Sequence, residues 1–312
     1  MRAPVLLIVN PNAGGGRAAK AAPAVTDRLR QFGLVVRTAE TRDLDHAGEL
    51  AIEGAQAGET VVVLSGDGMI GAVANQLRDI SGATMGILPG GRGNDLARVL
   101  GIPLDPLQAC AVIAEGVPHL LDLGEVDGTA FVGIASAGFD SEANRIANEA
   151  PSRLGNLVYA YGALRALLSW RPATFEIELD PPGERVSFTG YTVAAANSRA
   201  YGGGMLMAPE AALDDGLLDI VLVERVGRLR FVMNLPKVFK GEHVRLPSVR
   251  VLRAREVEIS ADRPFTLYAD GDPISQLPAR VRCVPGAMRV LVPPTQGESS
   301  VFSSSAASRQ ET

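Results

Sequence analysis

The sequence predicts a two-domain protein, with an N-terminal α/β domain built on a mostly parallel sheet and a C-terminal antiparallel β-sandwich that carries a helix. Three observations predict this fold class. The chain has 312 residues, more than one hydrophobic core comfortably holds. Short apolar runs alternate with helical segments in the first part, whereas single residues alternate in polarity in the second. We therefore expect domains over residues 1–123 and 124–294, followed by a Ser-rich disordered tail over residues 295–312.

The N-terminal part has the pattern of repeated β-α units. Strands buried on both faces are predicted for the runs VLLIVN, LVVRTAE, TVVVLS and MGILPG, at residues 5–10, 34–40, 60–65 and 85–90. The segments between them predict helices over residues 17–33, 46–58 and 69–77, with Gly33 and Gly58 where helix C-caps belong. Such alternation favours a parallel sheet with helices on both faces, and such sheets bind ligands at the carboxyl ends of their strands.

The C-terminal part has the two-residue period of antiparallel strands. Segments with this period are TFEIELD, EVEIS, FTLYAD, ARVRCV and MRVLV, at residues 174–180, 256–260, 265–270, 279–284 and 288–292. The tripeptides DGT, PPG, DDG and DGD predict tight turns between strands. One helix is predicted from Ser152 to Trp170, with Ser152 as its N-cap. The pattern indicates a sandwich.

Composition excludes several classes of protein. A net charge of −5 argues against nucleic acid as a partner. The two cysteines, Cys110 and Cys283, lie far apart and are expected to be reduced and buried, without a disulfide framework or a metal-binding set. No apolar run is long enough to span a bilayer, and the short run after the N-terminus is too short for a signal peptide. We expect a cytoplasmic protein.

Positive charge is concentrated in one stretch. Between Arg225 and Arg255 there are nine Lys or Arg residues and a single acid, Glu242. Two interpretations are open: an ordinary solvated face, or a surface that meets anionic lipid headgroups. The segment LRFVMNLPKVFK within this stretch mixes apolar and basic residues, although Pro236 would kink a long amphipathic helix.

Three glycine-containing loops follow predicted strands and precede helices. They are NPNAGGGR at residues 10–17, SGDG at residues 65–68 and PGGRGND at residues 89–95. Glycine lets backbone N–H groups approach a ligand closely, and a helix start offers unpaired donors and the positive end of a dipole. At one edge of one sheet, the three loops would surround phosphate groups. None has the spacing of a Walker A loop or a clean dinucleotide-binding motif.

Asp67 is the lone carboxylate in these loops. Among phosphates a carboxylate is repulsive unless it holds Mg²⁺, meets a substrate hydroxyl or caps a helix. From the residues alone, all three roles stay open.

The motifs together resemble the diacylglycerol kinase catalytic family, which includes bacterial lipid kinases and is related to sphingosine and ceramide kinases. The resemblance rests on NPNAGGG, SGDGMIGAVANQL and LPGGRGNDLARVLGIP in that order, and it extends over residues 5–292. In the second half it rests on the motifs Gly138-Phe139-Asp140, Tyr201-Gly202-Gly203-Gly204, Ala208-Pro209, Asp214 to Asp219 and Tyr268 to Asp272.

The resemblance implies an ATP- and Mg²⁺-dependent kinase that phosphorylates a lipid hydroxyl, most simply that of diacylglycerol. It implies nucleotide binding by Asn10, Pro11, Asn12, Ala13, Gly14, Thr41, Gly66, Asp67, Gly68, Met69, Ile70, Gly71, Ala72, Arg92 and Asn94. It implies a catalytic base in the turn that carries Asp270 and Asp272, and a structural Mg²⁺ site with Asp215 and the carbonyl of Leu217 as ligands. Asp67 is a further candidate for the base, and the sequence does not choose among these three carboxylates. It also implies transient contact with an anionic membrane, and a homodimer is one option for the assembly.

Three positions depart from the family pattern. Met69 and Arg92 stand where the family usually has threonine, so that a hydroxyl able to meet phosphate is lost at each, and Asp272 stands where it usually has glutamate. Arg92 can offer phosphate a charged fork instead, whereas Met69 cannot. Two alternatives therefore stay open. An NAD kinase also uses a GGDG loop and phosphorylates a soluble hydroxyl, and a degenerate chain would bind nucleotide or lipid without catalysis.

Overall fold

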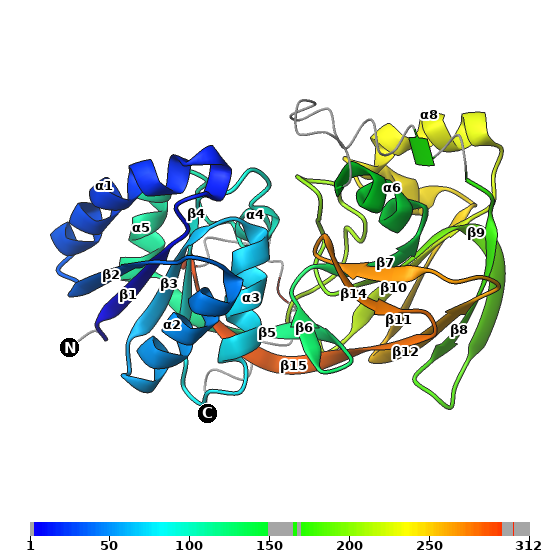
Figure 1. The fold of residues 1–312 in the computed structure, drawn as a ribbon. Helices are drawn as coiled ribbons and strands as arrows, with labels where there is room; N and C mark the ends of the chain where they lie inside the picture. The colour runs from blue at the N-terminus through cyan, green and yellow to red at the C-terminus, as the bar shows by residue number, and fades with distance from the viewer. Residues whose placement is uncertain (1–2, 149–164, 167–169, 295–301, 303–312) are drawn as a thin grey trace.

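The computed structural model describes residues 3–148, 165–166, 170–294 and 302. It shows an N-terminal α/β domain and a C-terminal, mostly antiparallel β domain with helices (Figure 1), which confirms the predicted fold class. Most of the predicted helix over Ser152–Trp170, and the predicted tail over residues 295–312 apart from Phe302, lie outside the described residues. Across the part of the chain that is described, no helix is both long and apolar enough to cross a membrane.

Four parallel strands form the N-terminal sheet. In spatial order they are β4 (Met85–Pro89), β3 (Thr60–Ser65), β1 (Val5–Val9) and β2 (Val36–Glu40). The first three are buried on both faces, as predicted. The prediction is wrong for β2, whose residues are half-buried or exposed because it is the edge strand and pairs with β1 alone.

Helices cover both faces of this sheet. α1 (Arg17–Gln31) contacts α5 (Pro106–Glu115), and α2 (Leu44–Gln56) contacts α3 (Asp67–Leu77) on the other face (Figure 1). Gly33 and Gly58 have positive φ just beyond α1 and α2, which confirms them at the helix ends. Sequence patterns did not indicate α5. A short helix, α4 (Asp95–Val99), follows the third glycine loop.

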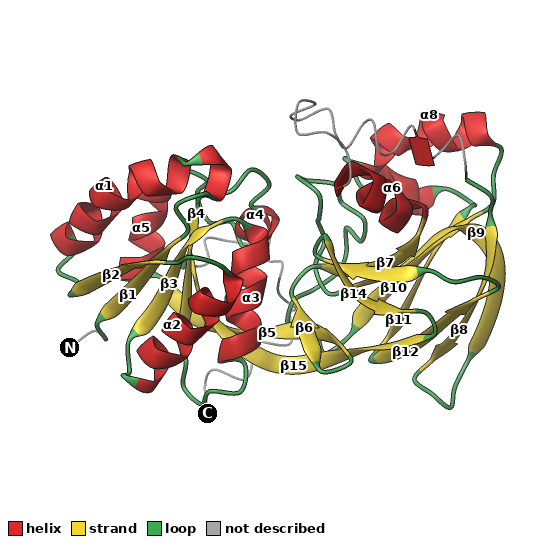
Figure 2. Ribbon diagram, viewed as in Figure 1, coloured by secondary structure: helices red, strands yellow, loops and turns green. Residues whose placement is uncertain are grey.

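In its described residues, the C-terminal domain consists of antiparallel strands with helices at one end. The strands are β7 (Ile134–Gly138), β8 (Ala173–Leu179), β9 (Arg185–Ala196), β10 (Leu218–Glu224), β11 (Val249–Ala254), β12 (Glu256–Ala261), β13 (Thr266–Ala269) and β14 (Asp272–Gln276). Two helices, α6 (Phe139–Asn148) and α8 (Arg228–Val238), lie together at one end of the strands (Figure 2). Beneath them Phe139, Tyr191 and Phe231 form an aromatic cluster with Trp170. A short 3₁₀ helix, η3 (Glu242–Arg245), follows α8.

Three strands join the two domains. β15 (Ala279–Val292) pairs with β12 at its start and with β4 near its end, and β5 (Val117–Val126) runs antiparallel beside it. β6 (Thr129–Phe131) forms a hairpin with β5. The two strands predicted over residues 279–284 and 288–292 are therefore one strand with a bulge, and the predicted domain boundary at residue 123 falls inside β5.

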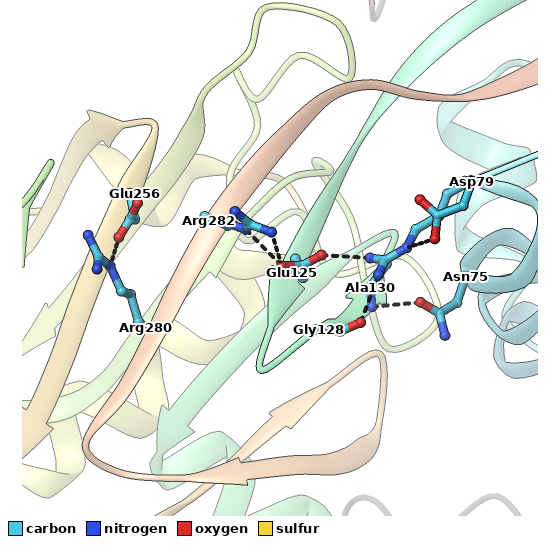
Figure 3. A network of polar contacts seen from close by, with 9 residues as sticks. Asn75, Asp79, Glu125, Gly128, Ala130, Glu256, Arg280 and Arg282 are labelled. Carbon is cyan, nitrogen blue, oxygen red and sulfur yellow. Dashed lines mark hydrogen bonds and ion pairs between the residues drawn. The ribbon is translucent and has the colours of Figure 1, made fainter. Parts of the chain in front are cut away.

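A polar network ties α3 to these joining strands (Figure 3). Arg78, just after α3, donates to Glu125 in β5 at 2.8 Å and to the carbonyl of Gly128 at 2.7 Å. Glu125 also accepts from Arg282 of β15 at 2.7 Å, and Asn75 of α3 accepts from the Ala130 backbone at 2.9 Å. This network couples the position of α3 to the joining strands.

The cysteines behave as the sequence predicts. Cys110 and Cys283 are both free and buried. Burial raises the pKa of Cys110 to about 11 and that of Cys283 to about 12, so that both thiols stay protonated and unreactive at neutral pH.

Candidate active site

The three glycine loops meet at the carboxyl edge of the N-terminal sheet. They approach so closely that side chains would not fit between them. A Cβ added to Gly14 would lie 2.4 Å from the carbonyl oxygen of Gly90, and one added to Gly91 would lie 2.4 Å from the Cα of Gly66. Glycine is therefore required at these contacts, and the loops form one backbone-lined surface as the sequence led us to expect.

Side chains fasten the loops to one another. The Asn10 amide donates to the Ser65 hydroxyl at 3.3 Å, and its oxygen accepts from the Asn12 backbone at 3.0 Å. Arg17 donates to the carbonyls of Gly14 at 3.1 Å and Gly91 at 2.9 Å, so that its exposed guanidinium bridges the first and third loops. This role of Arg17 was not predicted from the sequence.

Two polar residues of the third loop have different roles. Asn94 is buried, and its amide both accepts from the Gly91 backbone at 2.9 Å and donates to the Gly91 carbonyl at 3.2 Å. It shapes the loop. Arg92 is exposed and has no hydrogen-bond or ion-pair partner among the described residues, so its guanidinium is available to a ligand.

Asp67 lies at the centre of the site and caps a helix other than its own. It is the first residue of α3, yet its carboxylate accepts from the Leu96 backbone of α4 at 3.2 Å. Burial raises the pKa of Asp67, and the neighbouring Asp95 carboxylate raises it further. A Cβ added to Gly93 would lie 3.1 Å from Asp67 Oδ2 and 3.3 Å from Asp95 Oδ2, so both carboxylates border the same small space.

The Asp67–Asp95 pair fits a divalent cation. Asp95 accepts from the Gly203 backbone at 2.8 Å through Oδ2, while its buried Oδ1 has no partner among the described atoms. Mg²⁺ typically binds one or two carboxylates and completes its shell with water and phosphate oxygens. Within the described residues no group of three or more His, Cys, Asp or Glu is arranged to hold a metal by itself. Asp95 and Gly203 were not predicted as site residues, although both lie in motifs that carry the family resemblance.

Several of the predicted nucleotide-binding residues have buried side chains. The Met69 side chain is 4% exposed and belongs to the N-terminal core, as does that of Ile70. Thr41 is buried at the end of β2, where its hydroxyl donates to the Asp43 carbonyl and its N–H to the Val9 carbonyl.

The turn between β13 and β14 brings Asp270 close to α3, and Asp272 follows two residues later. A Cβ added to Gly71, in α3, would lie 3.8 Å from Asp270 Oδ2. The two aspartates differ sharply in environment, because Asp270 is half-buried with its carboxylate among backbone donors while Asp272 is exposed.

The Asp270 carboxylate is saturated with hydrogen bonds. It accepts from the N–H groups of Val132 at 2.8 Å, Gly133 at 2.9 Å and Ile134 at 3.0 Å. Burial raises the pKa of Asp270, and these donors act in the opposite direction. A Cβ added to Gly133 would lie 2.4 Å from Asp270 Oδ1, so the contact depends on glycine there. Through these hydrogen bonds Asp270 links the end of β13 to the start of β7.

Asp215 and Leu217 lie apart from this cluster, beside the start of β10. Asp215 accepts from the Leu217 backbone at 3.0 Å through one oxygen and pairs with Arg253 through the other. Arg253 also lies 3.5 Å from Asp219. Because the guanidinium already supplies the positive charge, Mg²⁺ at Asp215 would have to displace it, and these residues fit a metal ion poorly.

Comparison with known proteins agrees with the architecture. A model of the diacylglycerol kinase catalytic domain matches residues 4–126, and a model of the YegS C-terminal NAD kinase beta sandwich-like domain matches residues 133–292. A diacylglycerol kinase of Mycobacterium tuberculosis is 36% identical over 93% of this chain and 95% of its own length. A diacylglycerol kinase of Bacillus subtilis is 29% identical over 94% of this chain and 97% of its own.

The fold also matches solved structures. The crystal structure of a diacylglycerol kinase from Bacillus anthracis superimposes with a TM-score of 0.74 and 22% identity, covering 93% of this chain and 97% of that one. At this identity the likeness shows the fold alone.

Proposed function

Since this chain belongs to the diacylglycerol kinase catalytic-domain family, we propose that it transfers the γ-phosphate of ATP to the hydroxyl of diacylglycerol, giving phosphatidic acid. The proposal rests on one observation above all: the three glycine loops and the Asp67–Asp95 pair meet at one edge of the N-terminal sheet, where Asp95 accepts a hydrogen bond from Gly203 of the C-terminal domain. Family membership supports a kinase that uses ATP and a lipid.

The loops suit a triphosphate. Phosphoryl transfer needs positioning and charge stabilisation more than covalent chemistry from the protein. We assign the phosphates to the backbone N–H groups of Gly14, of residues 66–69 at the start of α3 and of residues 92–93, with Arg92 contributing charge at the open side. Mg²⁺ would be held by Asp67 and Asp95 and, once bound, would neutralise charge on the β- and γ-phosphates.

Asp272 is the candidate general base. Asp270 cannot easily accept a proton from an acceptor alcohol, because its oxygens already accept hydrogen bonds from Val132, Gly133 and Ile134. Asp67 is engaged with Leu96 and faces Asp95. Asp272 is exposed at the same turn and free to take the proton from the lipid hydroxyl as that oxygen attacks the γ-phosphorus.

The lipid acceptor determines where in the cell the protein must act. Diacylglycerol lies in a bilayer and ATP is cytoplasmic, so the proposal includes a cytoplasmic protein in transient contact with a membrane surface.

A transfer assay tests the proposal. The protein is incubated with γ-labelled ATP, Mg²⁺ and either diacylglycerol in mixed micelles or NAD. We expect labelled phosphatidic acid, and a loss of roughly 100-fold or more in kcat for Asp67→Asn. The matched control is Asp79→Asn, which alters an exposed acid just beyond the other end of α3 and should leave kcat unchanged.

The alternatives have distinct signatures. Labelled NADP would identify the NAD kinase alternative. Binding of ATP without transfer to either acceptor would identify a non-catalytic regulator and overturn the proposal.

A further inference from the structure

α8 presents an apolar stripe to solvent. Leu229, Val232, Met233 and Pro236 have the i, i+3, i+4, i+7 spacing that places residues on one face of a helix. Leu229 is 75% exposed and Met233 is 68% exposed. The helix is anchored through its other face, where the Phe231 ring packs 4.9 Å from that of Phe139. The exposed apolar residues therefore do not contribute to the packing of this helix against the domain.

Cations accompany the stripe. Arg230, Lys237 and Lys240 have no acidic partner within ion-pair distance among the described residues. By contrast, Arg250 and Arg253 on β11 pair with acids. Phe239, immediately after the helix, is a further exposed apolar residue at 56%. The α8 face is defined as Leu229, Arg230, Val232, Met233, Pro236, Lys237, Phe239 and Lys240.

The chemistry of the α8 face matches an anionic bilayer. Apolar residues can enter the boundary between headgroups and acyl chains while neighbouring cations remain with the phosphates. Eleven residues are too few to cross a bilayer, so the helix would lie in its plane. We propose that the α8 face docks the protein on membranes that contain anionic lipid.

The location of α8 links docking to catalysis. The Leu206 N–H donates to the carbonyl of Val238, the last residue of α8, at 3.0 Å. Three residues earlier, the Gly203 N–H donates to Asp95 at 2.8 Å. A bilayer against α8 would therefore lie beside the catalytic loops. This link rests on the proposed function, whereas docking itself does not.

Vesicle binding tests docking without any reaction. Sedimentation is measured with vesicles of pure phosphatidylcholine and with vesicles containing phosphatidylglycerol, at low and high salt. We expect binding to the anionic vesicles only, weakened at 1 M salt where the Debye length falls to about 3 Å. Leu229→Gln/Met233→Gln and Lys237→Gln/Lys240→Gln should each lower the affinity about tenfold or more.

Matched controls remove the same chemistry elsewhere. Val35→Gln/Leu107→Gln alters two exposed apolar residues of the N-terminal domain, and Arg28→Gln/Arg30→Gln removes two cations from α1. Both should bind vesicles like the parent chain. Equal binding by the α8 variants and the parent would overturn the proposal, and so would equal loss in the controls.

A soluble substrate separates the two proposals. With a short-chain diacylglycerol below its micelle concentration, the α8 variants should keep the kcat of the parent protein. One outcome would support docking and contradict the proposed function. In that outcome neither the parent protein nor any variant phosphorylates diacylglycerol, and only the α8 variants lose vesicle binding.

Discussion

At the scale of single residues, the two aspartates of the turn Asp270-Gly271-Asp272 have different proposed roles. Asp270 has a structural role, and Asp272 is the proposed base. Asp270 is half-buried and accepts from three backbone N–H groups, whereas Asp272 is exposed and its side chain has no hydrogen-bond partner among the described residues. Removing a buried acceptor leaves donors unsatisfied, which costs stability, and removing an exposed base costs only rate. Substitution of Asp270 should therefore lower stability, and substitution of Asp272 should lower the reaction rate.

We predict that Asp270→Asn lowers the free energy of unfolding by about 3 kcal/mol, because an amide cannot accept all three N–H groups. Asp272→Asn should change it by less than about 0.5 kcal/mol while lowering kcat by about 100-fold or more. Denaturant unfolding and steady-state kinetics on both variants check this. Asp272→Glu, which restores the usual family residue, serves as the control and should retain activity. An inactive but stable Asp270→Asn protein would contradict the assignment.

The sequence predicted which residues belong to the candidate site better than it predicted the burial and contacts of those residues. The loops and Asp67 were identifiable because their glycines and their place after apolar runs are visible in the chain. The buried orientation of Met69 was not, since it depends on which face of α3 meets the core. The bridge made by Arg17 joins residues 74 apart in the chain, and no local pattern announces it.

At the scale of elements, α3 serves the site at one end and the joining strands at the other. Its first residue is Asp67, and Asn75 and Arg78 near its end bind the β5–β6 hairpin (Figure 3). The chain after that hairpin, residues 132–134, holds Asp270. The network therefore links the glycine loops to the turn that carries the proposed base, Asp272.

We predict that Glu125→Gln lowers kcat several-fold with little change in the KM for ATP, because the loops themselves stay anchored on the sheet. It should also lower the free energy of unfolding by about 1–3 kcal/mol, since Arg78 loses its charged partner. Steady-state kinetics with varied ATP measure both constants. The matched control is Glu256→Gln, which alters another Glu–Arg pair shown in Figure 3 but touches no part of α3. Identical kcat values for the two variants would rule out the coupling.

Elements with a clean period were predicted, and those without one were missed. The strands β8 and β12 alternate in burial, so their polarity pattern indicated them. β10 is buried along most of its length and lacks that alternation. β2 was assigned correctly as a strand, but its place at the sheet edge follows from strand order, which a local run of residues does not encode.

At the scale of the whole molecule, one continuous sheet passes through both domains. β15 belongs to the β12 pairing on one side and contributes Met288, Val290 and Val292 to the N-terminal core on the other. The two domains are thus joined by shared strands as well as by chain connections. We therefore expect that unfolding of one domain destabilises the other domain.

We predict that ATP with Mg²⁺ raises the unfolding temperature reported by Trp170, the single tryptophan, although that residue lies in the C-terminal aromatic cluster. Nucleotide at 100 times its Kd stabilises the native state by about 2.7 kcal/mol. Tryptophan fluorescence and far-UV circular dichroism should shift together by several degrees. Mg²⁺ alone is the control. A nucleotide-dependent shift in the dichroism without one in the fluorescence would mean that the domains unfold independently.

The path of β15 also has a consequence for biosynthesis. Residues 279–292 complete the sheet and core that residues 5–89 begin, so a ribosome must add about 200 further residues after β4 before the first domain can close. Until then the open edge of β4 is exposed in the nascent chain, which makes it a natural client for a holding chaperone.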